Sequence, residues 1–170
     1  MNDTLLALAG KACDRLDTLC RAVAALFLGI IAIAATVQVA GRYVVGYSPP
    51  WIEELTRYSF IWMTMLGAAV LVKNNGHAVI DIVVARLAGS ARRAHAGMVH
   101  VAILACAMVL VVQGTHIIAI VHQQLSPAMR ISMAYVYAAL PVGGLIIAAQ
   151  CLNALLQMRR CHRDHLSGGT

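Results

Sequence analysis

Four long apolar segments constrain the fold of this chain more than any other feature. They cover residues 22–40, 51–72, 96–121 and 131–156. A helix needs about 20 apolar residues to cross a hydrocarbon core of about 30 Å. Because hydrocarbon offers no partner to backbone N–H and C=O groups, such segments cross it as helices. The sequence therefore predicts an all-α integral membrane protein with four transmembrane helices.

The composition agrees with this class. Hydrophobic residues make up 61% of the chain and charged residues 12%, whereas a soluble domain carries about 25% charged residues. The first segment has a longer uncharged run than the roughly 7–15 residues of a signal-peptide core, so we expect it to be retained. No linker, repeat or low-complexity tract divides the 170 residues. We expect one membrane domain over residues 1–170, in which residues 157–170 form a cytoplasmic tail.

The basic residues predict the orientation. Three arginines lie on one side of the predicted bundle: Arg42 and Arg130 in the first and third connections, and Arg57 in the first two turns of the second span. The other ten lysines and arginines fall in the N-terminal segment, the second connection and the tail: Lys11, Arg15, Arg21, Lys73, Arg86, Arg92, Arg93, Arg159, Arg160 and Arg163. The positive-inside rule places both termini in the cytoplasm. This distribution indicates membrane lipid, not nucleic acid, as the partner of the net charge of +6.

The residues that carry common chemistry do not form a recognisable site. The five cysteines include no C-x-x-C pair, and the chain has no G-x-S-x-G, H-E-x-x-H or P-loop motif. Histidines occur in only one of the four segments, whereas a bis-histidine haem needs ligands from facing helices. We therefore expect no enzyme activity, no catalytic residue, no metal and no cofactor.

Two segments outside the spans have helical patterns. Before the first span, apolar residues recur every three or four positions, at Leu5, Leu8, Ala12, Leu16 and Leu19. They predict either an amphipathic helix on the membrane surface, which we favour slightly, or an extension of the first span. In the second connection, Asn74-Asn75-Gly76 predicts a turn, and the spacing of Val79, Val83 and Leu87 predicts a short cytoplasmic helix after it.

The fourth segment contains Pro141-Val142-Gly143-Gly144 near its middle. Proline removes one backbone hydrogen bond and glycines allow backbones to approach closely. We expect a kink or a tight helix contact at this position.

The start of the second segment carries three charged side chains within its first two turns. Ser48 and two prolines suit a helix start, and Trp51 suits an interfacial anchor. Glu53 and Glu54 lie one turn before Arg57, so one arginine can answer two acids. One interpretation is a helix start that satisfies its own charges. The other notes the surplus acid, which Arg42 or a neighbouring subunit could neutralise, and we prefer packing of Arg42 against this acidic start.

These residues resemble a known family. Trp51-Ile52-Glu53-Glu54-Leu55-Thr56-Arg57-Tyr58, the preceding Arg42-Tyr43 and Gly76-His77-Ala78-Val79-Ile80-Asp81 are similar to the small membrane subunit of tripartite ATP-independent periplasmic (TRAP) transporters, the DctQ-like small permease. The motifs cover roughly the first half of the chain. The second half agrees in span count and length.

The resemblance implies a small subunit that scaffolds a large multi-span transport subunit and helps to dock a periplasmic substrate-binding protein. It implies a place in a bacterial inner membrane and sodium-coupled uptake of an organic acid such as a C4-dicarboxylate. Interface or structural roles would fall on Arg42, Trp51, Glu53, Glu54 and Arg57, and on Gly76, His77 and Asp81 in the cytoplasmic connection.

Two alternatives come from other classes. A self-sufficient four-span exporter would use a membrane carboxylate for proton coupling, but Glu53 and Glu54 lie at the start of a span beside Arg57. A membrane redox protein would show a haem spectrum.

Overall fold

The computed structural model of the chain describes residues 2–84 and 89–167, with side chains at residues 10–44, 46–73 and 97–155. The elements in order are α1 (Asn2–Ala40), a short π-helix η1 (Gly41–Val45), α2 (Pro50–Val84), α3 (Gly89–Val121), α4 (Met133–Tyr137) and α5 (Ala139–Ser167). Apart from an isolated bridge between Leu125 and Ser132, the described ranges contain no β structure. The all-α prediction is confirmed.

Four stretches are long and apolar enough to cross a membrane. They are Gly10–Val44, Pro50–Lys73, Gly97–Val121 and Met133–Leu155, and each overlaps one of the four predicted spans. The first is longer than predicted because α1 continues from Asn2 to Ala40 without a break. This continuity favours the alternative in which the N-terminal segment extends the first span. Its amphipathic character stays a prediction.

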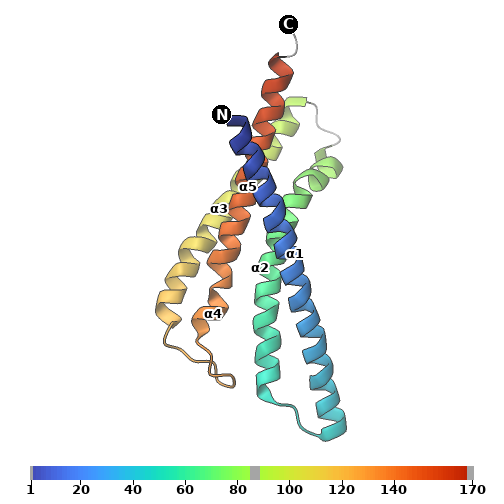
Figure 1. Ribbon diagram of the computed structural model, residues 1–170, viewed down its shortest axis with the longest axis vertical. Helices are drawn as coiled ribbons and strands as arrows, with labels where there is room; N and C mark the ends of the chain where they lie inside the picture. Colours follow the sequence, from blue (N-terminus) through green and yellow to red (C-terminus); the bar gives the residue numbers. More distant parts are fainter. Residues whose placement is uncertain (1, 85–88, 168–170) are drawn as a thin grey trace.

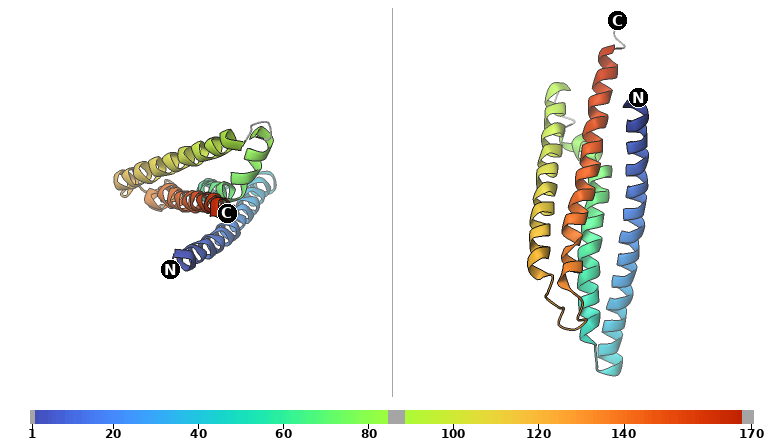
Figure 2. Two further views of the ribbon diagram at one scale, coloured as in Figure 1. Left: turned by 90° about the horizontal axis from the view of Figure 1, so that it is seen from above. Right: turned by 60° about the vertical axis from the view of Figure 1, so that its left-hand side comes forward.

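The helices form an open row (Figures 1 and 2). The first hairpin, α1 with α2, contacts the second through α2 and α5, and α3 packs on the far side of α5. Within the described ranges, α1 and α3 make no contact with each other. In the most apolar stretch of each span, 39% of the residues are buried for the last span and 6% for the first. The last span is therefore the central element, and α1 and α3 leave apolar faces exposed.

Two adjacent glycines let α5 sit between its neighbours. A Cβ atom on Gly143 would lie 2.9 Å from Cβ of Met65 on α2. A Cβ atom on Gly144 would lie 3.0 Å from the carbonyl oxygen of Ala107 on α3. The buried residues Ala69, Ala107 and Ile147 form the core at this contact. The tight helix contact predicted around the Pro-Val-Gly-Gly sequence is confirmed, and it faces two helices at once.

The last span is broken where the proline predicts a disturbance. α4 ends at Tyr137 and α5 begins at Ala139. Pro141 has no N–H to donate to the carbonyl of Tyr137, four residues earlier. The Ala138 N–H closes the short helix by donating to the Ala134 carbonyl at 2.9 Å.

The second connection differs from the prediction at its start. α2 remains helical through Asn74-Asn75-Gly76 and ends at Val84, so the predicted turn was wrong. Helix over Val79–Val84 is confirmed, and residues 85–88 lie outside the described ranges. The last part of α2 leans away from the axis of the bundle (Figure 1).

The two ends of the bundle carry different features. The start of α1 and the end of α5 lie together, at what we call the terminus end (Figure 1). The α1–α2 connection and the connection between α3 and α4 lie at the opposite end, which we call the loop end.

Candidate interface sites at the two ends of the bundle

At the loop end, the first turns of α2 separate the two adjacent glutamates. The Arg57 Nη2 donates to Glu53 Oε1 at 3.0 Å, and both side chains are more than 60% exposed. The expected i, i+4 pair is therefore present as a surface ion pair. The helix start itself is closed by the backbone, since Ile52 N donates to the Pro49 carbonyl at 3.2 Å.

Glu54 points the other way and is buried, with 9% of its surface exposed. Its carboxylate accepts three hydrogen bonds from one connection: from the Ser126 hydroxyl, from Ala128 N at 3.0 Å and from Met129 N at 3.0 Å. Hydrogen bonds to a charged acceptor are stronger than those between neutral groups. Glu54 therefore faces its own bundle, and it ties the start of α2 to the connection between α3 and α4.

That connection, residues 122–132, which we call the 122–132 loop, is also bonded to itself. Ser126 N donates to the Ile131 carbonyl at 2.9 Å, and Arg130 N donates to the Ser126 carbonyl at 3.1 Å. Ser132 closes its end, because its hydroxyl donates to the His122 carbonyl at 2.9 Å and accepts from Ala134 N at 3.3 Å as the N-cap of α4. These hydrogen bonds hold the short, polar loop in one shape.

Within the loop, Arg130 has a left-handed backbone, with φ of 53°. A non-glycine residue in this region costs free energy and persists only where surrounding bonds hold it. Its own N–H bond to Ser126, and the Glu54 bonds to Ala128 and Met129, provide that hold. The Arg130 side chain is exposed.

Arg42 does not fulfil the preferred expectation. It lies in η1, its side chain is exposed, and within the described part of the chain it forms no ion pair with Glu53 or Glu54. The 122–132 loop takes the place expected for it beside Glu54. Trp51 is 47% exposed, on the outside of the α2 start. Three turns further along α2, Trp62 Nε1 donates to the Tyr135 carbonyl at 3.2 Å, and its ring stacks on Phe27 of α1.

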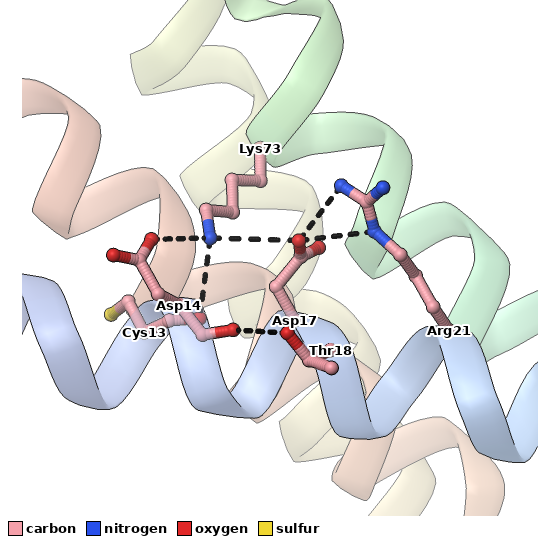
Figure 3. Close-up of polar contacts among 6 residues, drawn as sticks. All are labelled: Cys13, Asp14, Asp17, Thr18, Arg21 and Lys73. Carbon is pink, nitrogen blue, oxygen red and sulfur yellow. Dashed lines mark hydrogen bonds and ion pairs between the residues drawn. The ribbon is translucent and has the colours of Figure 1, made fainter.

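A second polar cluster joins α1 and α2 at the terminus end (Figure 3). The Lys73 Nζ lies 2.7 Å from Asp14 Oδ1 and 3.5 Å from Asp17 Oδ2. Asp17 Oδ2 also accepts from Arg21, with the Nη2 atom at 2.8 Å. Asp17 is buried, with 5% of its surface exposed. One buried carboxylate thus serves two cations and cross-links the first hairpin.

Sequence reasoning did not select Asp17 or Lys73 as site residues. The spacing of Asp17 and Arg21 was visible as an i, i+4 pair, but the approach of Lys73 depends on how α1 and α2 pack. Among the described residues, Asp17 Oδ1 and both amide atoms of Gln150 are buried without a hydrogen-bond partner. A buried polar atom of this kind calls for water or another ligand.

The remaining expected residues give less information. Gly76, His77 and Asp81 lie on the last part of α2, and their side chains lie outside the described residues. His100 is buried on α3, where its carbonyl accepts from Cys151 Sγ at 3.1 Å. No group of three or more potential metal ligands occurs among the described residues.

Comparison with known proteins identifies what the chain is similar to. Residues 31–161 match the sequence profile of the family described as tripartite ATP-independent periplasmic transporters, DctQ component. This range includes the last quarter of α1, all of α2 to α4 and most of α5.

Two relatives agree with this family. The isethionate TRAP transporter permease protein DctMQ of Oleidesulfovibrio alaskensis is 30% identical over 147 residues, which cover 80% of this chain and 23% of the relative. The sialic acid TRAP transporter small permease protein SiaQ of Vibrio cholerae serotype O1 is 25% identical over 130 residues, 74% of this chain and 72% of the relative. The chain thus spans about a quarter of the first relative's length and most of the second's.

Proposed function

The chain belongs to the DctQ-component family of TRAP transporters, and on this premise we propose that it scaffolds a large transport subunit and helps to dock a periplasmic binding protein. Membership and four apolar helices make it a multi-pass inner-membrane protein. The family is a transporter component and not an enzyme. The single observation that carries the proposal is the family match, which runs from residue 31 to residue 161.

The placement of charge supports a scaffolding role. The acidic residues whose side chains the structure describes lie toward the two ends of the bundle, in the Glu53–Arg57 pair, the Glu54 site and the Asp14–Asp17–Lys73 cluster. Between residues 58 and 72, 97 and 121, and 131 and 155 the spans carry no Asp, Glu, Lys or Arg. Charged groups inside a membrane mark ion and substrate pathways, so these stretches fit a subunit that supports such a pathway in a partner.

The proposed orientation follows from the basic residues. The terminus end would lie in the cytoplasm, because ten of the thirteen lysines and arginines precede the first span, follow the last or occupy the second connection. The loop end, with the 122–132 loop, would then face the periplasm.

The solute and the driving force are further parts of the proposal. The relatives' names mention isethionate and sialic acid. Both are organic anions, so we propose an organic acid as solute, of which a C4-dicarboxylate is one example, imported with sodium.

Reconstitution tests this function. The tagged chain is co-expressed with the large transport protein and isolated in mild detergent, and uptake of radiolabelled organic acids is measured in liposomes with and without a sodium gradient. We expect stable co-purification, and uptake only when the large subunit and the binding protein are both present. Sodium-dependent uptake or proton-driven export by liposomes holding this chain alone would refute the proposal, and the second result would establish the exporter alternative.

A further inference from the structure

The 122–132 loop offers a surface of fixed shape at the loop end. Leu125 is 60% exposed and Ile131 is 38% exposed, and Arg130 lies between them in sequence with its side chain exposed. The internal hydrogen bonds and the Glu54 carboxylate hold the backbone beneath them. A surface that is ordered before binding loses less conformational entropy when a partner docks.

The charge of this surface is positive. Five charged residues belong to the segments that meet at the loop end: Arg42, Glu53, Glu54, Arg57 and Arg130. Glu54 is buried under the loop, and Glu53 is neutralised by Arg57. Among the described residues, the exposed cations without an ion pair at this end are Arg42 and Arg130. Arg42 extends from the end of the first span, whereas Arg130 stands on the loop itself.

We propose that the 122–132 loop is a docking surface for an acidic face of the periplasmic binding protein, with Arg130 as its specificity-determining residue and Glu54 as the residue that positions it. This inference rests on the proposed function. The arginine supplies the charge that selects and steers an acidic partner, and Leu125 and Ile131 supply apolar contact beside it. Charges at the rim of an interface act mainly on association rate and partner choice.

The experiment uses the full complex in liposomes and varies the concentration of the binding protein. Three variants of this chain are compared with the parent: Arg130→Glu, Arg130→Gln and the matched control Arg42→Glu, which makes the same charge change at the same end. We expect Arg130→Glu to raise the binding-protein concentration for half-maximal uptake by about tenfold and Arg130→Gln by about threefold. Arg42→Glu should change it by less than about twofold. At a saturating concentration of binding protein, all three variants should reach the maximal uptake rate of the parent.

Further outcomes decide the inference. Added salt should weaken docking to the parent more than docking to Arg130→Gln, because the variant lacks the Arg130 charge that salt screens in the parent. Equal half-maximal concentrations for the parent and Arg130→Glu would overturn it. An equal rise in the half-maximal concentration for Arg130→Glu and Arg42→Glu would also overturn it. That result would indicate that the net positive charge of the loop end attracts the partner, and not Arg130 in particular. Loss of the large subunit from Arg130→Glu would show that the loop binds that subunit instead.

The proposed function can survive each of these failures. It fails only if the parent chain does not co-purify with the large subunit or transports alone.

Discussion

The two ends of this bundle hold a buried carboxylate in different ways. At the loop end, Glu54 accepts from one hydroxyl and two backbone N–H groups of a loop 72 to 75 residues away. At the terminus end, Asp17 accepts from the side chains of Arg21 and Lys73. Backbone donors cannot move without changing the loop, whereas long basic side chains can follow a moving helix. The Glu54 site therefore fixes a shape, and the Asp17 site braces two helices while tolerating small shifts.

This difference fits the sides of the membrane to which we assign the ends. A periplasmic surface that meets a separate protein benefits from a fixed shape. A cytoplasmic junction between two spans needs cohesion across a helix pair. A buried carboxylate would thus serve the proposed recognition at one end and mechanical support at the other.

Replacement of Glu54 by Ala should give the largest effect of the set. It removes the acceptor of three hydrogen bonds at once, so the 122–132 loop loses its attachment to α2. Hydrogen exchange at the Ala128 and Met129 amides should accelerate by about tenfold or more, because local opening then exposes them. Mass spectrometry of the purified complex measures this exchange.

Glu54→Gln is the matched control for that variant. Its oxygen still accepts, but its NH₂ group faces a donor, so the acceleration should be intermediate. The amides of the α2 core should not change in either variant. Unchanged exchange of the loop in Glu54→Ala would show that the loop keeps its shape without this carboxylate.

Replacement of Asp17 by Ala should have the next largest effect, and on stability instead of loop order. Removing one partner of a buried ion pair costs about 3–5 kcal/mol. We expect about 2 kcal/mol here, because partly exposed partners are already partly hydrated; the Arg21 side chain is 53% exposed and that of Lys73 is 25% exposed. Unfolding in mixed micelles with rising dodecyl sulfate, followed by tryptophan fluorescence, measures it.

Asp14→Ala serves as the control at the same junction. Its side chain is 72% exposed, so its loss should cost under about 1 kcal/mol. Equal losses for the two variants would contradict the assignment of Asp17 as the brace. Loop exchange should stay unchanged in both, since the two ends are separate.

The sequence was sufficient for features that depend on neighbours along the chain. Hydropathy is such a property, so the four spans were predictable, as was the pairing of Glu53 with Arg57 one helical turn away. The break before Pro141 also follows from the local chemistry of proline. The turn at Asn74-Asn75-Gly76 failed because residues that favour turns can be carried inside a long helix.

The contacts at the two candidate sites could not be predicted from neighbours along the chain. Whether Glu54 meets Arg42 or Ser126 depends on which helix packs beside α2, and that is decided by the glycine contacts of α5 with α2 and α3. The same holds for Lys73 and Asp17, which lie on different helices. The only sequence signal for the Glu54 site was the Ser126-Pro127 pair in the short third connection. It did not indicate that Glu54 would be the partner of Ser126.

The smallest expected effect belongs to the Glu53–Arg57 pair, and it tests whether burial distinguishes the two glutamates. Both side chains are more than 60% exposed. A double-mutant cycle of Glu53→Ala and Arg57→Ala, followed by the same micelle unfolding, should give a coupling of about 0.3 kcal/mol, because solvent competes for both charges. Salt at high concentration should remove most of it. A coupling of 1.5 kcal/mol or more, on the order of a charged hydrogen bond, would mean that Glu53 is held as firmly as Glu54. The contrast between an exposed pair and a buried, loop-binding carboxylate would then no longer explain why two adjacent acids occupy the start of α2.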